Sequence, residues 1–249
     1  MLDLSVIIPS YNEEFRILST LNSVHDCLTQ AVPNFEIIAV NDGSKDGTSQ
    51  VVEEFAKHHE RVRLISYPMN KGKGFAVKTG VLAANGELVL MNDADGSSPI
   101  EECLRLNEAI QKGADIAIGS RAKPDPTRVV KALSYRTHMG NTFNSIVQSL
   151  LLPGIYDTQC GFKLFKRQVA REIFSLARIN GYGFDVEILY IARQRNYVIA
   201  EVPINWSNVD GSKVNIMIDP AKMLFEIMKI KINALTGHYR ENPTIKVHD

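Results

Sequence analysis

An apolar run that ends in two aspartates constrains this chain more than any other feature. The run Glu87–Asp95 reads ELVLMNDAD and follows Asn85-Gly86, so it predicts a buried strand entered from a turn. Ligands normally bind at the C-terminal ends of strands in an open α/β sheet. Asp93 and Asp95 can both reach one divalent cation whose remaining positions are filled by phosphate oxygens and water. A polar loop with a helix N-cap is the alternative interpretation of the same residues.

Strands and helices are predicted to alternate through the first half of the chain. Besides the run that ends at Asp95, strands are expected at Val6–Ile8, Phe35–Val40, Arg61–Tyr67 and Ala114–Ile118, with helices ending near Thr29, over Thr48–His58, ending at Asn85 and over Pro99–Lys112. This alternation predicts βαβ units with right-handed crossovers. We therefore expect an α/β fold with a mostly parallel, Rossmann-like sheet flanked by helices. Neither a Walker A motif nor GxGxxG is present, which disfavours a P-loop or dinucleotide site.

The periodicity changes after Pro124. Expected there are a helix over Thr127–Leu152, a polar turn into a strand over Asp157–Phe165, a helix over Val186–Arg195, a strand over Val198–Asn205 and a helix over Pro220–Leu235. The last helix has a narrow polar stripe on an otherwise apolar circumference, made of Lys222, Glu226, Lys229 and Asn233.

The charge and cysteine content of the chain argue against several classes of protein. Lysine plus arginine and aspartate plus glutamate each number 28 in the 249 residues, so no global field favours nucleic acid. Cys27, Cys103 and Cys160 are widely spaced without a CxxC pair. This argues against a disulfide framework or a structural zinc site and agrees with a reducing cytosol. We find no secretory signal and no apolar run near the roughly 20 residues that span a bilayer.

Three polar loops are expected to meet at one edge of the sheet, over residues 11–13, 41–46 and 93–95. There a carboxylate could accept the imide N–H of uracil and Tyr11 could stack on the base. Lys71 or Lys73, on a glycine-rich loop, would add positive charge. The alternative for Asp42 is an Asx-turn that closes a strand.

These motifs resemble those of a known family. Ile7–Glu13, Val40–Ser44, Asn70–Gly72 and Asp93–Asp95 are similar, in this order, to the successive motifs of family 2 glycosyltransferases, which are inverting enzymes of the GT-A fold. In the second half, Asp157–Lys163, Phe184–Glu187, Glu201–Trp206 and Gly211–Lys213 resemble the branch that contains dolichyl-phosphate β-glucosyltransferases and prokaryotic polyprenyl-phosphate relatives. The resemblance covers most of the chain.

The resemblance implies a metal-dependent transfer of glucose from UDP-glucose to dolichyl or polyprenyl phosphate. It implies that Asp42 reads the base and that Asp93 and Asp95 bind Mg²⁺ or Mn²⁺. The full set of expected nucleotide-sugar-binding residues is Pro9, Tyr11, Glu13, Asp42, Lys71, Asp93 and Ala94.

The acceptor side is expected to need charge rather than a strong base. A phosphate monoester has its second pKa near 6, so the acceptor oxygen is already largely anionic at neutral pH. Arg121 and Arg136 are the expected phosphate ligands, because guanidinium groups favour bidentate contact. For Arg128 and Lys131 we favour a solvated helix face. Asp95, Asp157 and Arg121 are the expected catalytic residues, with Asp157 orienting the acceptor or acting as base toward a hydroxyl.

Two further segments have two interpretations each. Gly181–Asp185 either shapes the donor-sugar pocket or forms a turn with a helix N-cap at Asp185. Trp206 either stacks on a sugar or packs at a strand end.

The expected organisation is a GT-A domain over 1–215, with a nucleotide-binding half over 1–121 and an acceptor half over 122–215. An amphipathic helix and tail follow over 216–249. That helix, or Ile146–Leu152, could lie in a membrane interface, with core or oligomer packing as the alternative. We expect a cytoplasmic, peripheral location at the cytoplasmic membrane face, a possible homo-oligomer and no nucleic-acid partner. The alternatives are a GDP-mannose-dependent transferase, a hydroxyl acceptor, a sugar nucleotidyltransferase or a non-catalytic binding module.

Overall fold

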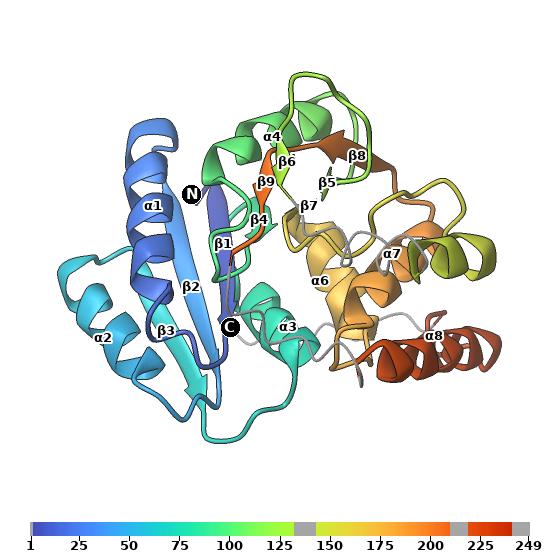
Figure 1. Ribbon diagram of the computed structural model, residues 1–249, viewed down its shortest axis with the longest axis horizontal. Helices are drawn as coiled ribbons and strands as arrows, with labels where there is room; N and C mark the ends of the chain where they lie inside the picture. Colours follow the sequence, from blue (N-terminus) through green and yellow to red (C-terminus); the bar gives the residue numbers. More distant parts are fainter. Residues whose placement is uncertain (1, 132–142, 210–218, 241–249) are drawn as a thin grey trace.

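A seven-stranded sheet with helices on both faces organises the computed structural model, which describes residues 2–131, 143–209 and 219–240 (Figure 1). Its strands are β1 (Leu4–Ser10), β2 (Phe35–Asp42), β3 (Val62–Tyr67), β4 (Leu88–Met91), β5 (Ile116–Ser120), β7 (Lys163–Lys166) and β8 (Ile199–Pro203). They lie in the order β3-β2-β1-β4-β7-β5-β8, and only β7 runs antiparallel to its neighbours. The predicted mostly parallel α/β sheet is confirmed.

The described helices are α1 (Ile17–Ala31), α2 (Thr48–His58), α3 (Lys73–Ala83), η1 (Ile100–Glu102), α4 (Cys103–Gln111), α6 (Arg167–Leu176), α7 (Phe184–Gln194) and α8 (Asp219–Leu235). Residues 143–150 are also helical. The expected helices of the first half and the C-terminal helix are all present. The helix α6 has no counterpart among the elements predicted from the sequence.

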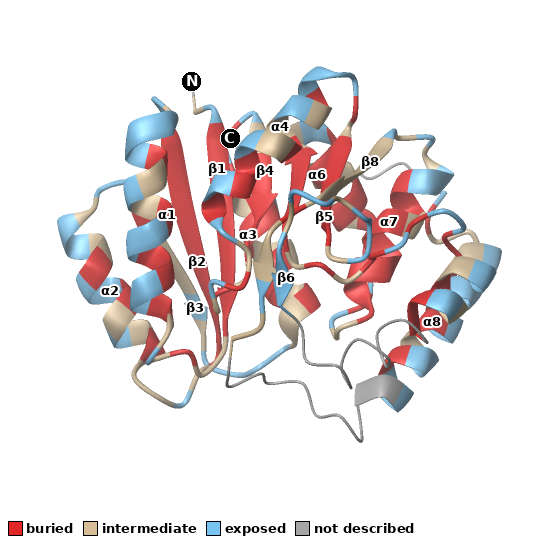
Figure 2. Ribbon diagram, turned by 45° about the horizontal axis from the view of Figure 1, so that its top comes forward, coloured by how far each residue is buried: buried red, intermediate tan, exposed pale blue. Residues whose placement is uncertain are grey.

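Two apolar cores lie on the two faces of the sheet, because successive strand residues point to opposite faces. Ile7 and Ile38 face a core shared with α3, α6, α7 and α8. Val6 and Ile37 face a core shared with α1, α2 and α4. Figure 2 shows the central strands buried almost throughout.

The expected helix over Thr127–Leu152 is wrong at its beginning. Val130–Lys131 form a short strand, β6, which pairs in parallel with β9 (Trp206–Ser207). The backbone N–H of Trp206 donates to the Val129 carbonyl at 3.0 Å. Pairing with a distant segment overrides the local helical pattern here, as tertiary contacts often do for β-branched residues.

The antiparallel direction of β7 determines which residues lie beside the C-terminal ends of the parallel strands. Lys163, the first residue of β7, lies in register with Met91 at the end of β4 and with Ile118 near the end of β5. The turn that precedes β7 therefore lies at the same edge as the C-terminal ends of the parallel strands. Residues 157–162 are brought to the residues that follow β4 and β5.

Candidate active site

An ion pair between Asp93 and Lys73 lies at this edge. Lys73 is the first residue of α3, and its Nζ lies 2.7 Å from Asp93 Oδ1. Burial acts to lower the pKa of Lys73, but the carboxylates of Asp93 and Asp185 outweigh it and hold that pKa above its usual value. Lys73 is therefore charged at neutral pH and neutralises Asp93.

Asp93 and Asp95 lie in the loop that follows β4. Both residues are partly exposed, while Ala94 between them is buried, and Ala94 and Asp95 form a turn. The backbone N–H of Ser97 donates to Asp95 Oδ1 at 2.9 Å. Two partly exposed carboxylates one residue apart offer hard oxygen ligands to a divalent ion.

Within the described parts of the chain, no cluster of three or more His, Cys, Asp or Glu side chains forms a closed metal site. Mg²⁺ is commonly held by one or two carboxylates together with substrate phosphates. The donor set here fits that open kind of site, in which Asp93 and Asp95 would supply the protein ligands.

Gly161 lies directly against the Asp93 carboxylate, a contact that the sequence pattern does not predict. A Cβ added at Gly161 would lie 2.0 Å from Asp93 Oδ2, so no larger residue fits without displacing the carboxylate. The two residues are far apart in sequence, and only the antiparallel β7 brings them together. The absence of a side chain at position 161 therefore lets Asp93 occupy this position.

Asp42, at the end of β2, is hydrogen-bonded to the glycine-rich loop before α3. Its Oδ1 and Oδ2 accept the backbone N–H groups of Lys71 and Gly72 at 2.7 and 3.0 Å. This replaces the Asx-turn interpretation with a contact to a distant segment. Each carboxylate oxygen has a further lone pair that can accept a hydrogen bond from a base. Recognition of a base by Asp42 stays a prediction.

The Asp42 contact also joins the expected site residues. Asp42 holds the backbone of residues 71 and 72, and the next residue, Lys73, reaches Asp93. The ends of β2 and β4 and the start of α3 thus form one connected group. Lys71 itself extends over the Phe75 ring, with its Nζ 4.5 Å from the ring centroid.

The other residues expected to bind the nucleotide sugar differ in burial and in hydrogen-bond partners. Pro9 is buried in β1, and Tyr11 is half-buried just beyond it. The Glu13 carboxylate is held by Arg16, whose Nε and Nη2 donate to it at 2.7 Å each. Ala94 is buried, and its carbonyl accepts the Thr20 hydroxyl at 2.8 Å. Glu13 is thus an ion-pair partner of Arg16. Binding of the nucleotide sugar by Pro9, Tyr11 and Ala94 stays a prediction.

Arg121 and Asp157 form a two-point ion pair. Arg121 Nε and Nη2 donate to the two carboxylate oxygens at 2.7 and 2.8 Å, and the Arg121 backbone N–H adds a third bond at 2.9 Å. Burial acts to raise the pKa of Asp157, but Arg121 outweighs it and lowers that pKa. Asp157 is therefore a weak base, which disfavours proton abstraction by it. The Trp206 ring packs on the Arg121 guanidinium, with the Arg121 Cζ 5.3 Å from the ring centroid.

A second buried pair, Lys163 with Asp185, lies behind the site. The Lys163 ammonium is fully buried, contacts Asp185 Oδ1 and donates to the Cys160 carbonyl at 2.6 Å. Asp185 is the second residue of α7 rather than its N-cap, which is Gly183. The sequence pattern points to Asp185 but not to its partner Lys163, because the two elements meet only in the folded chain.

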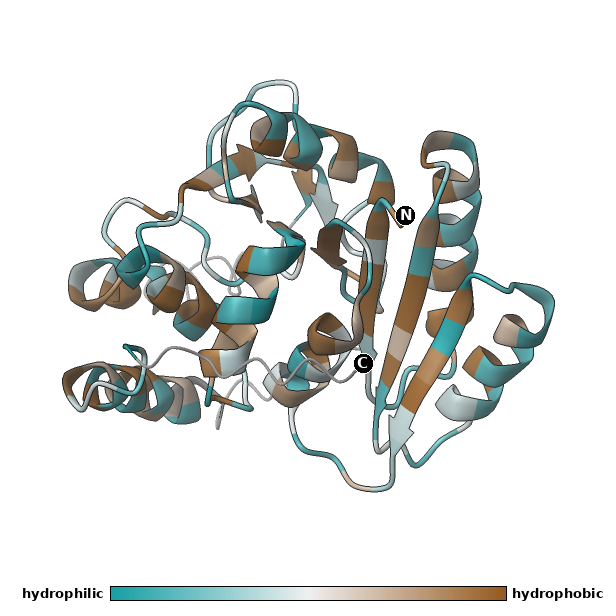
Figure 3. Ribbon diagram, turned by 180° about the vertical axis from the view of Figure 1, so that it is seen from behind, coloured by the Kyte–Doolittle hydropathy of each residue, from teal (hydrophilic) through white to brown (hydrophobic). Residues whose placement is uncertain are grey.

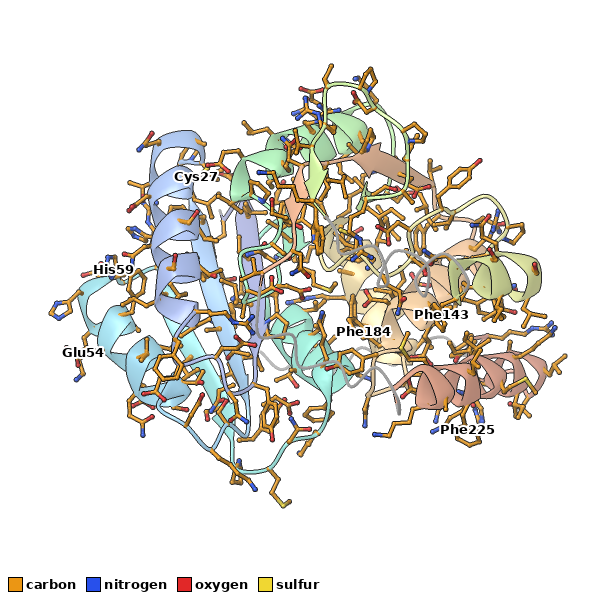
Figure 4. All side chains as sticks on the ribbon, in the orientation of Figure 1. Cys27, Glu54, His59, Phe143, Phe184 and Phe225 are labelled. Atoms are coloured by element: carbon orange, nitrogen blue, oxygen red, sulfur yellow. The ribbon has the colours of Figure 1, made fainter. Side chains whose placement is uncertain are left out.

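The loop before α7 connects the site to α8. The backbone N–H of Gly183 donates to Glu226 Oε2 on α8 at 2.7 Å. On its other side, the Asn180 carbonyl accepts the Gly74 N–H of α3 at 2.8 Å. Residues 180–183 therefore bridge α8 and the start of α3, which carries Lys73. Figure 4 shows Phe184, the first residue of α7, between these two helices.

Arg128 and Lys131 lie away from this group of residues and not on the expected helix face, and the expected phosphate ligand Arg136 falls outside the described residues. Arg128 Nη1 lies 3.3 Å from Glu102 Oε1, and Lys131 is an exposed residue of β6. Neither is placed beside Asp93 by a described contact. Arg136 and the Gly211–Lys213 motif fall outside the described residues. The three cysteines are free thiols, and among the described helices none has the length and apolar content needed to cross a bilayer.

Solved structures share this architecture. Glucosyl-3-phosphoglycerate synthase from Mycobacterium tuberculosis, in its complex with phosphoglyceric acid, superposes with a TM-score of 0.70 at 19% identity, over 93% of this chain and 79% of that one. Its complex with Mn²⁺, UDP-glucose and phosphoglyceric acid gives the same TM-score at 18% identity and the same coverage of both chains. The sheet order, with an Asp-x-Asp pair after β4, is that of a GT-A fold.

Sequence comparison identifies the family. Residues 5–174 match the model described as Glycosyl transferase family 2, so the chain belongs to this family. A dolichyl-phosphate beta-glucosyltransferase from Dictyostelium discoideum is 38% identical, over 95% of this chain and 76% of the relative. Relatives of the same name from Saccharomyces cerevisiae and Homo sapiens are 39% and 35% identical, over 96% and 98% of this chain and 77% and 80% of their own lengths.

Proposed function

We propose that this protein transfers glucose from UDP-glucose to dolichyl or polyprenyl phosphate, with inversion to a β-linked lipid-phosphate sugar. The observation that carries the proposal is the agreement of relatives from an amoeba, a yeast and human over more than nine tenths of the chain. The aligned length spans the Asp93 loop, the turn before β7 and α8. The similarity to these relatives therefore includes both the part proposed to bind the sugar donor and the part proposed to bind the acceptor.

The site chemistry suits a phosphate acceptor. The nucleophilic oxygen of a lipid phosphate is anionic near neutral pH, so no side chain has to remove a proton from it. Asp157, with its lowered pKa and its pairing to Arg121, fits orientation of that arginine and not base catalysis. We assign Arg121 to the acceptor phosphate, whose attack on the anomeric carbon from the face opposite UDP gives inversion.

On the donor side, we assign Asp93 and Asp95 to a divalent ion and Lys73 to charge balance beside it. A bound Mg²⁺ or Mn²⁺ would neutralise the charge that develops on the departing diphosphate. A protein of the same fold binds Mn²⁺ together with UDP-glucose, which supports this assignment. We assign Asp42 and Tyr11 to the base, while Lys71 and the N-terminus of α3 add positive potential near the phosphates.

A lipid-phosphate acceptor places the reaction at a bilayer. We propose that the protein acts as a peripheral protein at the cytoplasmic face of a membrane. The division into a donor half over 1–121, an acceptor half over 122–215 and a C-terminal element over 216–249 belongs to the same proposal.

The experiment is a product assay with a panel of donors. The protein is incubated with UDP-glucose or GDP-mannose, Mg²⁺ or Mn²⁺ and a short polyprenyl phosphate, and the lipid products are identified by mass spectrometry. We expect a hexosyl lipid phosphate from UDP-glucose that a chelator abolishes. A product from GDP-mannose alone would contradict the donor assignment, and no product with any donor would contradict the function.

Two variants test the metal assignment. Asp93→Asn and Asp95→Asn should each reduce turnover by about a hundredfold or more, because each removes a charged ligand of the ion. The matched control is Asp26→Asn on α1, where the aspartate is 76% exposed and remote from the sheet edge. Full activity in both site variants would refute the assignment.

A further inference from the structure

The α8 helix has a buried face that fixes its position. Met223, Ile227 and Ile230 are buried against the core shared with α7. At the C-terminal end, Asn233 donates to the Tyr239 hydroxyl, which donates to Glu187 of α7 at 2.6 Å. This side of α8 therefore packs on the rest of the protein.

The opposite face of α8 is also apolar. Its exposed large side chains are Leu224, Phe225, Met228, Ile232 and Leu235, and Phe225 and Leu235 are 71% and 83% exposed. At 3.6 residues per turn these five fall within an arc of about 100° opposite the buried face. Figure 4 shows Phe225 on the side of α8 turned away from the rest of the chain, and Figure 3 shows brown, hydrophobic residues along this helix. We call these five residues the outer face of α8.

Lysines border the outer face on both sides. Lys231 lies next to Leu224 around the helix, while Lys229 and Lys222 lie next to Phe225, and all three are exposed. Within residues 221–235 the only acidic residue is Glu226, which lies on the inner side against Gly183. An apolar arc between cationic borders is the pattern of a helix that lies in an anionic membrane interface, where lysine ammonium groups reach the lipid head groups.

A second copy of this chain is a poorer fit to the same face. Pairing of two outer faces would bring the bordering lysines of both copies together, and the exposed positions of 221–235 offer no carboxylate to balance them. Like charges brought together at an interface are unfavourable. Anionic lipid supplies the missing negative charge.

The outer face lies beside the candidate active site. Glu226 directly follows Leu224 and Phe225 in α8 and accepts the Gly183 N–H. The loop that contains Gly183 also packs on the start of α3 beside Lys73. A membrane on the outer face would therefore be close to the residues that handle the sugar donor.

We propose that the outer face of α8 lies in the interfacial region of an anionic bilayer and docks the protein on the membrane that holds its acceptor. This inference rests on the proposed function for the identity of the acceptor. The surface itself is defined by the structure, and its membrane binding can be measured without any sugar or acceptor.

The test is vesicle sedimentation of the full chain without nucleotide sugar. Wild-type protein should bind vesicles of phosphatidylcholine with phosphatidylserine and bind pure phosphatidylcholine vesicles much less. The double variant Phe225→Ser/Ile232→Ser should lose about tenfold or more in binding, because two large apolar side chains leave the interface. The matched control is Leu104→Ser/Val198→Ser, which removes two exposed apolar side chains of similar exposure on other surfaces and should bind like wild type.

Three outcomes would overturn the proposal: no binding of wild-type protein to anionic vesicles, equal binding by the Phe225/Ile232 variant, or a wild-type dimer that this variant dissociates while vesicle binding is unchanged. Light scattering measures the last. A water-soluble short-chain acceptor separates the two proposals, since the variant should transfer glucose to it at the wild-type rate. Vesicle binding without any glucosyl product would leave the docking surface intact and contradict the proposed function alone.

Discussion

A residue without a side chain decides where the Asp93 carboxylate can lie. Gly161 comes from the turn before β7, and Asp93 from the loop after β4. A methyl group at position 161 would occupy the place of Asp93 Oδ2. Because the obstruction is the end of a flexible side chain and not backbone, the fold can yield by moving Asp93.

We therefore predict that Gly161→Ala separates activity from stability. Displacing Asp93 by an ångström or so should lower kcat/KM by about a hundredfold, since catalytic geometry tolerates little misplacement. The free energy of unfolding should change by less than about 1 kcal/mol. Initial rates and urea unfolding measure the two effects. Loss of both together would show that Gly161 serves the fold and not the placement of Asp93.

The Arg121–Asp157 pair should contribute to stability in a pH-dependent way. Asp157→Asn removes the charge that balances a largely buried guanidinium. Breaking a buried pair typically costs about 3–5 kcal/mol. Here we expect about 2 kcal/mol, because the Arg121 side chain is 32% exposed and solvent screens part of the charge.

The sign with pH follows from the lowered pKa of Asp157. The folded carboxylate has a lower pKa than its unfolded value of about 3.9, so its contribution is fully present above that value. As pH falls toward the folded pKa, Asp157 becomes protonated and the contribution disappears. Urea unfolding at neutral pH and near pH 3 should show the wild type losing its advantage over Asp157→Asn. A difference that stays constant over this range would contradict the assignment, and Asp26→Asn serves as the exposed control.

At the scale of elements, the sequence was most informative where consecutive elements are neighbours in space. The strands and helices through β5 follow βαβ units, so the carboxylates of Asp42, Asp93 and Asp95 could be placed at one edge from local patterns. The residues before β7 predict a polar turn that leads into a strand. Nothing in its residues shows that this strand inserts between β4 and β5 in the opposite direction.

The missed contacts have the same cause. The pairing of Lys163 with Asp185 and the approach of Gly161 to Asp93 depend on where β7 inserts. The error at Val130–Lys131 arises because β6 exists only through pairing with β9. Local patterns cannot show such contacts, because they record only neighbours within one element.

The contact between α8 and Gly183 gives an element-scale prediction. Glu226→Ala removes the acceptor for the Gly183 N–H and loosens the loop that packs on α3. A hydrogen bond to a charged group contributes about 1.5–3 kcal/mol, so we expect KM for UDP-glucose to rise about tenfold with a smaller change in kcat.

Glu226→Gln is the matched control for this prediction. Its amide oxygen can still accept the Gly183 N–H, so KM should stay close to the wild-type value. Steady-state kinetics with a soluble short-chain acceptor exclude any effect of membrane binding. Equal KM values for the alanine variant and the wild type would show that α8 does not support the donor loop.

At the scale of the whole molecule, basic and acidic residues balance, so attraction to an anionic surface must come from local groups of basic residues. With 28 basic and 28 acidic residues, the protein as a whole has no long-range attraction to an anionic surface. Its described residues place apolar side chains with bordering lysines on α8, at the opposite end of the molecule from α1 and α2 (Figure 1). Any salt dependence of membrane binding should therefore originate in these few lysines.

We predict that Lys229→Gln/Lys231→Gln lowers binding to anionic vesicles by about thirtyfold at low salt, since each lysine near such a surface contributes about 1 kcal/mol. Raising the salt concentration shortens the range of the remaining attraction. Wild-type binding should fall with salt, while binding of the lysine variant should be weak and nearly independent of it. The Phe225→Ser/Ile232→Ser variant retains the lysines and should keep the salt dependence of the wild type at lower affinity. If the lysine variant kept that dependence, the attraction would come from cations elsewhere on the molecule, and the outer face of α8 would not be the surface that meets the lipid.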